Sequence, residues 1–543
     1  MVQNHHGVTS TTEIVARPAI NTTPSPIVLI GTAGKGPLNT PTLCNNLDEV
    51  LRIFGRLTDD EFSIPKDAYD IYQQTQARVI IINVADATDV EAITDESTTF
   101  GSNNKANLSN GYVSLLTLDT NVSAPAKFAP DGTLTLPTGI TGVTNVKSAD
   151  GLTTYVLDTD FSVAANVITN LDAGIASEAN VIVEYTATLA VDVDFSLDSD
   201  NGILSRISTG KLLYKATVSV DYSRVDASSV TATEIIGTNT GGTKTGAELI
   251  TDIPGLLNIS LNKGVLLAPD FTHQLVQGGG ANPVTTKLLT LANTCGTIVV
   301  SDTPNTNKED AVTWAFNNAS ERIYAIGLGF IKKTINGQLL TRPSAASVAG
   351  VIAGLDALEG GVANSPSNRT INGVEGLAKP ASFSIAVFDD SANTDANFLN
   401  FNDNAVATIV NNNGYKVWGN YSTSDSGLQT RFINVKRALD ETRVKLAKKA
   451  ESYVDRNISS GYVDAVTAAL KSEINTLIGN PGKGLLLSGD VWPASADKNT
   501  PESLLSGRIF FNVVVAIASP AQQIILNTTL QNGYLTEFTE ALV

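Results

Sequence analysis

The stretches IVLIG at residues 27–31 and VIIINV at residues 79–84 decide the fold. Each is a short and continuous apolar run, and the first one ends at glycine, which is typical of a strand buried on both faces. The residues between them carry helical patterns at 47–54 and 66–76. Strand, helix and strand in this order predict an α/β unit.

The same alternation returns after residue 205. Apolar runs at 264–269, 296–301 and 322–326 predict three more buried strands, and a helix is expected at 308–319. Because strands alternate with helices, we expect a mainly parallel sheet whose faces are covered. The predicted α/β domain has two parts, residues 26–99 and 206–345.

Residues 100–205 have a different character. Thr, Val, Asp, Asn and Gly dominate, and strand-like segments at 153–157 and 181–185 alternate with turn-rich pieces. We therefore expect an all-β sandwich that is inserted into the α/β domain. This insertion is also acidic, since residues 151–200 hold nine acidic residues and no Lys or Arg.

The C-terminal part is predicted to be an α+β domain at 346–519, with a long amphipathic helix at 428–457 and a second helix at 461–478. Residues 431–456 hold eight Lys or Arg against four acids, in a chain whose net charge is −18. These basic residues form either a solvated helix face or a docking face for an acidic partner. The candidates for a docking face are Lys436, Arg437, Arg443, Lys445, Lys448 and Lys449.

Both ends of the chain are predicted to be extended arms, residues 1–25 and 520–543. β-branched residues fill 8–23, and the apolar run at 524–527 has no local hairpin partner. Segments of this kind are suited to add a strand to the sheet of another molecule. The residues expected to do so are Val8, Ile14, Val15, Ile524, Ile525 and Leu526. The predicted linkers are Thr23–Pro26 and Ser519-Pro520.

Length and composition exclude several classes of protein. A chain of 543 residues is expected to form three or four domains. Its net charge of −18 makes it a poor candidate for direct binding of nucleic acid or of an anionic membrane. No run approaches the length of about 18 apolar residues that a membrane span needs, and no signal peptide pattern is present, so no membrane insertion is expected. The two isolated cysteines, Cys44 and Cys295, form no disulfide framework and no zinc motif.

Residues that could carry chemistry are few. The glycine-rich stretch 31–36 is followed by Pro37, so it does not match a P-loop and is expected to be a tight turn. Of the three histidines, His5 and His6 lie in the predicted arm, and His273 has no accompanying G-x-S-x-G motif. No cluster has the spacing of metal ligands. The sequence therefore predicts no catalytic residue, no cofactor and no metal site, which indicates a structural protein and not an enzyme.

Several stretches resemble the tail sheath proteins of contractile phages, R-type tailocins and related injection systems. The similar segments are 4–8, 30–41, 47–55, 342–350, 365–368, 371–374, 414–420, 432–437, 454–457, 499–501 and 507–508. Their order and spacing carry the resemblance, because no single segment is diagnostic. The resemblance covers roughly residues 1–90 and 210–543 and leaves the insertion out.

The resemblance implies a protein that assembles with itself into stacked hexameric rings. The rings would form a helical sleeve around a tail tube and contract to drive the tube through a cell envelope. The implied partners are further copies of the chain, the tail tube protein, and the baseplate and tail terminator proteins. In such a sleeve the arms would join neighbouring subunits. We expect the C-terminal domain to lie inside and the insertion to face outward. The basic helix is the candidate for the element that faces the tube, because contacts between paired charges at a partly wet interface are weak enough to be released. The sleeve would belong to the virion and assemble in the host cytoplasm.

Two other functions stay open at this point. The sheath of a tailocin or of a contractile injection system shares the fold and the mechanics, and the sequence does not separate it from a phage sheath. The Thr-rich insertion also suggests a surface adhesin or a surface-layer protein, and the lack of a signal peptide pattern counts against that alternative.

Overall fold

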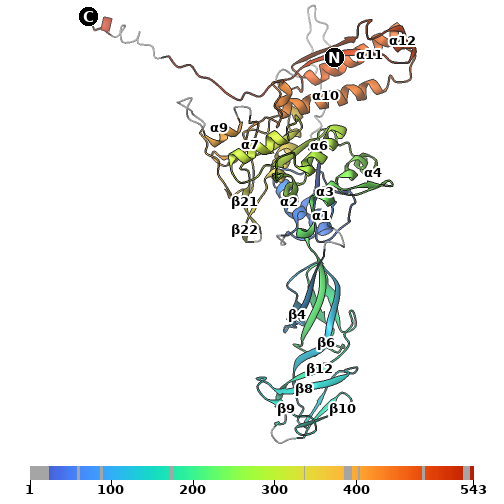
Figure 1. Ribbon diagram of the computed structural model, residues 1–543, viewed down its shortest axis with the longest axis vertical. Helices are drawn as coiled ribbons and strands as arrows, with labels where there is room; N and C mark the ends of the chain where they lie inside the picture. The colour runs from blue at the N-terminus through green and yellow to red at the C-terminus, as the bar shows by residue number, and fades with distance from the viewer. Residues whose placement is uncertain are drawn as a thin grey trace, which may run out of the picture.

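The computed structural model describes residues 24–57, 61–85, 90–171, 175–335, 337–384, 394–400, 404–479, 484–529 and 539–542. These residues form an α/β body, a long β insertion that projects from one end of the body, and a helical lobe on the opposite side (Figure 1). The C-terminal segment leaves the body as an extended tail.

The body is built on a six-stranded sheet in the order β2-β3-β1-β18-β19-β20. Its strands are β1 (Ile27–Gly31), β2 (Thr42–Cys44), β3 (Val79–Asn83), β18 (Val265–Leu267), β19 (Ile298–Asp302) and β20 (Ile323–Ile326). All neighbours pair in parallel except β2, which runs antiparallel to β3. Every residue of the five parallel strands is buried, because helices cover both faces. The predicted parallel, covered sheet is confirmed.

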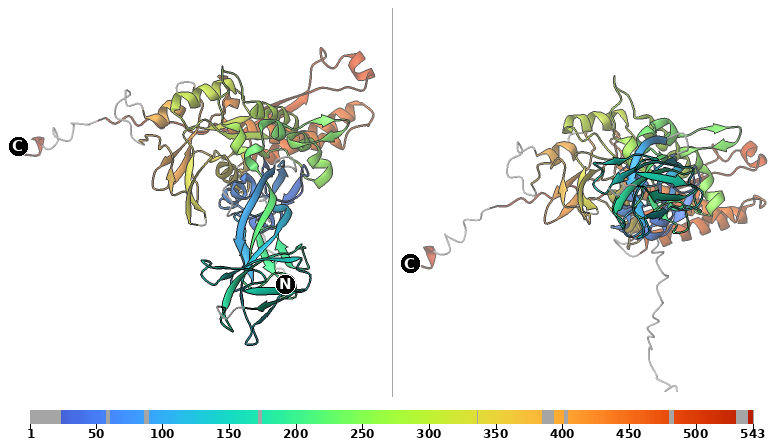
Figure 2. Two further views of the ribbon diagram at one scale, coloured as in Figure 1. Left: turned by 60° about the horizontal axis from the view of Figure 1, so that its bottom comes forward. Right: turned by 90° about the horizontal axis from the view of Figure 1, so that it is seen from below.

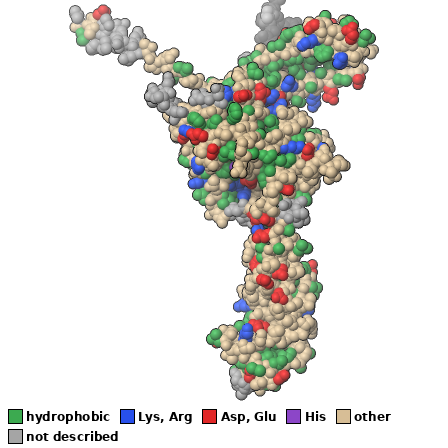
Figure 3. Space-filling view, viewed as in Figure 1, with side chains coloured by type: hydrophobic (Ala, Val, Ile, Leu, Met, Phe, Trp, Pro, Cys, Tyr) green, Lys and Arg blue, Asp and Glu red, His purple; other side chains and the backbone are tan. Residues whose placement is uncertain are grey.

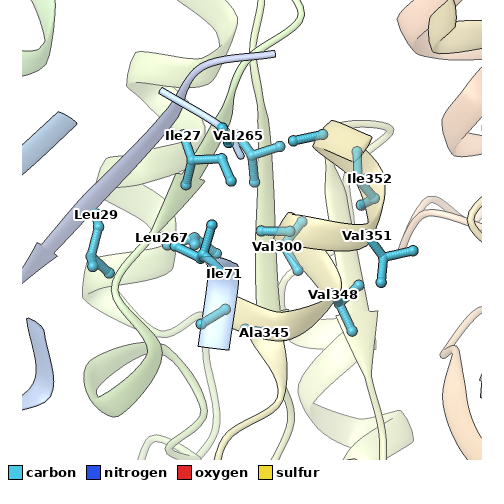
Figure 4. Close-up of a cluster of buried hydrophobic side chains, with 14 of the residues drawn as sticks. Ile27, Leu29, Ile71, Val265, Leu267, Val300, Ala345, Val348, Val351 and Ile352 are labelled. Carbon is cyan, nitrogen blue, oxygen red and sulfur yellow. The ribbon is translucent and has the colours of Figure 1, made fainter. Parts of the chain in front are cut away.

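One face of the sheet packs against helices that come from both ends of the body's sequence. Val300 points from the sheet toward the helix that carries Val348 and Ile352, and Leu29 belongs to the same buried cluster (Figure 4). The helices on this face are α1 (Leu47–Phe54), α2 (Ser63–Tyr72) and α8 (Ala345–Asp356). α1 has the predicted bounds, whereas α2 begins and ends a few residues earlier than the helix expected at 66–76.

The opposite face forms a second core. Val28 and Val299, which alternate with the residues of the first face, pack here with Leu288 and Trp314. The helices on this face include α6 (Pro283–Cys295) and α7 (Lys308–Asn317). Smaller elements around the body are α3 (Ala232–Ile236), α4 (Ile253–Leu257), α5 (Pro269–Thr272), α9 (Asp395–Asn400), β16 (Asn239–Thr240), β17 (Thr243–Lys244), β21 (Ile331–Ile335), β22 (Gln338–Arg342), β23 (Arg369–Thr370), β24 (Gly376–Leu377), β25 (Thr408–Asn411) and β26 (Tyr415–Trp418).

Helix α8 corrects the predicted domain boundary at residue 346. Its sequence is rich in small residues, and nearly all of them are buried within the body. Gly350 allows α8 to approach α2 closely, because a Cβ at this position would lie 2.8 Å from the carbonyl oxygen of Ile71. Ile409 and Val417 of the following strands belong to the same core. The body therefore continues well beyond residue 345.

The insertion is an all-β structure, as predicted, but it is longer than residues 100–205 (Figure 2). β4 and β15 pair along their length, from Val90 opposite Val225 to Thr99 opposite Thr217, so both belong to the insertion. A six-stranded antiparallel sheet in the order β4-β15-β6-β12-β8-β9 lies with two three-stranded sheets, β10-β11-β7 and β13-β14-β5. The strands are β4 (Val90–Thr99), β5 (Lys105–Asn107), β6 (Val113–Lys127), β7 (Thr133–Thr135), β8 (Gly142–Ser148), β9 (Thr154–Tyr155), β10 (Phe161–Ala164), β11 (Val167–Asn170), β12 (Asn180–Thr186), β13 (Phe195–Asp198), β14 (Ile203–Arg206) and β15 (Thr217–Val225).

The glycine-rich stretch after β1 is the seat of the insertion on the body. The ring of Tyr112, from the insertion, lies directly against the backbone of Gly34 and Gly55, where any Cβ would overlap it. The Tyr112 Oη accepts a hydrogen bond from the amide of Arg56 at 2.6 Å. Lys35 forms an ion pair with Asp200 of the insertion. The predicted turn is therefore also a docking surface within the chain.

The lobe has a core of its own. Val435 and Leu446 from the first long helix pack with Val466 and Ile474 from the second and with Val491 from a hairpin. Its elements are α10 (Ile433–Glu451), α11 (Ser460–Ile478), β27 (Ser488–Pro493), α12 (Pro501–Leu505) and β28 (Phe511–Ala516). The predicted second helix is confirmed by α11, and α10 is shorter at both ends than the helix expected at 428–457.

The seat of the insertion can be tested with Gly34→Ala. The added methyl group overlaps the Tyr112 ring, and overpacking of this kind destabilises by about 1–3 kcal/mol. Hydrogen–deuterium exchange should therefore rise in residues 108–113, and the midpoint of thermal unfolding should fall. Gly255→Ala is the matched control, because a Cβ at Gly255 meets no atom within 4 Å.

A double-mutant cycle separates this contact from a general loss of stability. Tyr112→Ala removes the ring that Gly34→Ala would overlap, so the double variant should lose less stability than the sum of the two single variants. Strictly additive losses in the free energy of unfolding would contradict the contact between Tyr112 and Gly34.

Candidate assembly surface

The β27–β28 hairpin at the outer side of the lobe presents two strand edges. The two strands pair in antiparallel fashion, with Val491 opposite Val513. Within the described part of the chain no third strand pairs with either of them. Each strand therefore offers a row of backbone N–H and C=O groups along its outer edge, which is a template for pairing with another strand.

The surroundings of the hairpin are apolar and exposed. Trp492 and Val514 lie on its outer face, and Leu505, at the end of α12, is 88% exposed. Figure 3 shows hydrophobic side chains gathered on the lobe. Exposed apolar groups beside free strand edges are typical of interaction surfaces.

The inner face of the hairpin is held firmly on α11. Val491 is fully buried beside Ile474, and Gly489 lies so close that a Cβ there would be 3.0 Å from the Ile474 side chain. Lys471 of α11 reaches Asp490 at 3.0 Å, and this charged hydrogen bond lowers the pKa of Asp490 below its ordinary value. A two-stranded sheet is marginal alone, so α11 is what keeps both edges in place.

The C-terminal segment leaves the body beside this lobe. Gln522 anchors its base, since its Nε2 donates to Asn420 Oδ1 at 2.6 Å and its Oε1 accepts from Tyr421 Oη at 2.6 Å. Beyond this anchor, the predicted arm residues Ile524, Ile525 and Leu526 are 80%, 71% and 83% exposed. They form no strand, so the strand expected at 524–527 is absent from the single chain, and no other described segment pairs with it.

The predicted residues of the N-terminal arm, Val8, Ile14 and Val15, lie outside the described residues. The described chain begins at residue 24, and the linker predicted at Thr23–Pro26 is partly wrong. Ser25 and Pro26 are buried, and Ser25 Oγ donates to Asp356 Oδ2 at 2.5 Å. The body therefore holds the chain firmly at Ser25.

The same carboxylate joins the lobe to the body. Arg437 of α10 donates from Nη1 and Nη2 to the two oxygens of Asp356, at 2.8 and 2.5 Å. A second ion pair links Arg322 of the body to Asp440 of α10 at 2.6 Å. The first half of α10 is thus fixed by charged hydrogen bonds that are shielded from water.

These contacts correct two of the six predicted docking residues. Arg437 is 4% exposed and Lys436 is 9% exposed, and Lys436 Nζ lies 3.5 Å from Asp440 and 3.6 Å from Glu321. Both side chains serve the junction with the body, so the prediction that they face a tube is wrong. The remaining four, Arg443, Lys445, Lys448 and Lys449, are exposed on the second half of α10.

The apolar run 509–515 in the sequence indicates the strand that forms β28, but no comparable pattern indicates its partner β27. The sequence SGDVWP contains glycine and proline, which hide the strand pattern. A continuous valine run with no other partner was the available signal. Within the described residues, no group of three or more His, Cys, Asp or Glu is placed to hold a metal ion, and no helix is long and apolar enough to cross a membrane.

Comparison with known proteins points to one family. Residues 279–423 match the family described as phage tail sheath protein, central domain. A putative prophage major tail sheath protein of Pseudomonas aeruginosa is 30% identical over 274 residues, which cover 50% of this chain and 66% of that relative, just under two thirds of its length. The tail sheath protein of Burkholderia phage BcepMu is 26% identical over 549 residues, covering 98% of this chain and 97% of the relative. Among solved structures, the helical sheath of the anti-feeding prophage in its contracted state aligns with 98% of this chain and 100% of that one, at 13% identity and a TM-score of 0.49.

The junction of lobe and body can be tested with Arg437→Met. Methionine keeps much of the side-chain volume but leaves Asp356 buried without its cation, and breaking a buried pair in this way destabilises by about 3–5 kcal/mol. Denaturant unfolding should show this loss. Arg443→Met on the same helix is the control: its side chain is 70% exposed and 4.0 Å from Asp440, so the change should stay within about 0.5 kcal/mol. Equal effects of the two substitutions would refute the anchoring role of Arg437.

Proposed function

The chain belongs to the tail sheath protein family, a family of structural proteins and not of enzymes, and from this premise we propose how it assembles. Copies of the chain form stacked hexameric rings, and the rings build a helical sleeve around a tail tube. The sleeve contracts and drives the tube through the envelope of a host cell. It is part of the virion and assembles in the host cytoplasm.

The free hairpin is the observation that carries this proposal. Among the described strands, none pairs with the outer edges of β27 and β28, so the lobe offers two edges, and one chain has two terminal segments. We propose that the N-terminal arm of one neighbour and the C-terminal arm of another add to these two edges. Val8, Ile14 and Val15 would lie in the first added strand, and Ile524, Ile525 and Leu526 in the second. Such backbone pairing is sequence-tolerant and strong because it satisfies whole rows of hydrogen-bonding groups.

An exchange of arms of this kind generates a polymer. Each contact joins different surfaces of two copies, and a heterologous contact that does not close on itself extends into a helix. The arms act as tethers, so rigid subunits can rotate against each other while the joints stay paired. Ser519-Pro520, between the lobe and the anchor at Gln522, is the proposed linker of the C-terminal arm.

The exposed half of α10 is proposed to face the tube. Arg443, Lys445, Lys448 and Lys449 present positive charge in a chain of net charge −18. Exposed charge pairs are individually weak and easily broken, which suits a sleeve that has to release the tube when it contracts. The tube, baseplate and tail terminator proteins are the proposed partners besides the chain itself.

Of the two alternatives to a phage tail sheath, one remains open and the other is disfavoured. The sheath of a tailocin or of a contractile injection system remains an alternative, because it uses the same sleeve without a DNA-filled head, and the neighbouring genes would separate the two. A surface adhesin is disfavoured by membership in the tail sheath family.

The role of the C-terminal arm is tested by replacing Ile524, Ile525 and Leu526 with serine. Electron microscopy of the concentrated protein should show sleeves for the unaltered chain and none for this variant, because the added strand loses its apolar contacts. The monomer should keep its unfolding midpoint, since the three side chains are exposed. Leu152→Ser, at an equally exposed position of the insertion, is the control and should leave assembly intact. Normal sleeves from the triple variant would contradict the proposed role of the C-terminal arm in assembly.

The tube contact is tested by reversing Lys445, Lys448 and Lys449 to Glu. Sleeve formation on added tail tubes should weaken strongly, and the effect should shrink at high salt because exposed charges are screened. Lys105→Glu in the insertion is the control. Unchanged co-sedimentation of the triple variant with tubes would remove the proposal for α10 without affecting the proposal for the arms.

A further inference from the structure

The insertion contains the same turn twice. Residues 158–162 read DTDFS and residues 192–196 read DVDFS. In both turns the first aspartate has a positive φ, 60° and 61°. In both, its amide donates to the carbonyl oxygen of the phenylalanine at 2.7 Å. A non-glycine residue with positive φ is uncommon, so two identical cases in a shared sequence motif indicate a common origin.

The second aspartate of each turn accepts an equivalent set of hydrogen bonds. The carboxylates of Asp160 and Asp194 accept from the amide four residues earlier, at 2.6 and 2.9 Å. Their carbonyl oxygens accept from the amides of Leu171 and Ile207, at 2.9 and 3.0 Å. The strand pairs that follow the turns, β10–β11 and β13–β14, each continue into a third antiparallel strand, β7 and β5 respectively.

The strand register repeats as well. Val183 lies opposite Ala124 and Val146, and Val220 lies opposite Glu96 and Leu118. On each side of the central strand, the partner of Val183 is 28 positions later in the sequence than the partner of Val220: residue 124 compared with 96, and residue 146 compared with 118. The same offset of 28 positions relates two hydrogen bonds at the strand ends. The amide of Phe128 donates to the carbonyl oxygen of Ala179 at 3.0 Å, and the amide of Phe100 donates to the carbonyl oxygen of Ala216 at 2.9 Å.

We infer that the insertion is two copies of one β module, with the second copy nested inside the first. The outer module consists of residues 90–120 and 190–225, and the inner module of residues 121–189. In the inner module a short turn, residues 149–155, joins Ser148 to Val156. The corresponding points of the outer module, Thr120 and Ala190, are joined by the whole inner module instead.

The geometry at this point suits a separable unit. The chain enters and leaves the inner module side by side, since the amide of Ala187 donates to the carbonyl oxygen of Thr120 at 2.8 Å. Tyr112 and Asp200, which hold the insertion on the body, both belong to the outer module. Figure 1 places β8, β9 and β10 of the inner module at the far end and β4 near the body. The outer module therefore lies between the inner module and the body. β6 continues from one module into the other, and Ser123 and Val122 of the inner module pair with Thr217 and Val218 of β15.

The test is an excision within the full-length chain. Residues 121–189 are replaced by ADGLTTY, the chain's own residues 149–155, which close the inner module at the equivalent point. Hydrogen–deuterium exchange should stay within about twofold of the unaltered protein in the body, in β4, β5, β13 and β14, and in β15 from Val220 on, because Thr217 and Val218 alone lose strand partners of β15 in the excision. Loss of protection in β4 and β15 would overturn the inference.

A pair of equivalent substitutions tests the same inference without any excision. Phe161 and Phe195 occupy matching positions, and both are buried. Phe161→Ala should raise exchange at least tenfold in residues 121–186 and leave β13–β15 protected, whereas Phe195→Ala should do the reverse. An equal rise throughout residues 90–225 for both variants would mean a single cooperative sheet and would contradict a modular insertion. Neither readout depends on the assembly proposed for the chain.

Discussion

The pairing of β1 with both β3 and β18 is the interaction on which the rest of the structure depends. Ile27 lies between Val79, which precedes the insertion, and Val265, which follows it. Because the sheet closes across this gap, a long β structure can leave the body without interrupting its core. Helices on both faces then bury every residue of the parallel strands, and the removal of this apolar surface from water is the main source of the body's stability.

Buried ion pairs, and not a shared apolar core, attach the lobe to the body. The body and the lobe have separate apolar cores, and the first half of α10 crosses between them with Arg437 on Asp356 and Asp440 on Arg322. Buried ion pairs add little net stability because desolvation offsets the Coulombic gain. Their hydrogen bonds are directional, however, so they define how the lobe sits on the body and therefore where the free hairpin edges point. Asp356 also holds Ser25, so the first described residues, the body and the lobe meet at one carboxylate.

Two outer parts of the molecule expose sheet edges and apolar side chains that a stable monomer normally covers. Soluble proteins normally protect the edges of their sheets, yet no other strand in the described part of the chain pairs with β27 or β28, which lie beside exposed apolar side chains. The C-terminal segment carries three consecutive exposed apolar residues past its anchor at Gln522. Both features fit a chain that completes its sheets only in an assembly. The insertion, in contrast, is complete in itself and is seated on glycines whose missing side chains make room for Tyr112.

The sequence by itself determined the elements whose signal is local. The apolar runs of β1, β3, β18, β19 and β20, the helix α11 and the family resemblance needed no knowledge of contacts between distant residues, since burial on both faces leaves its mark on consecutive residues. Only the tertiary structure decided where domains end. By position in the sequence, β4 falls in the α/β domain and α8 in the C-terminal domain. In the structure β4 pairs within the insertion, and α8 packs in the core of the body. It also divided six basic residues of one helix into two that are buried against distant acids and four that are exposed. The physical reason is the same in each case: the partner lies tens to hundreds of residues away, and a pattern along the chain does not encode which distant group a side chain meets.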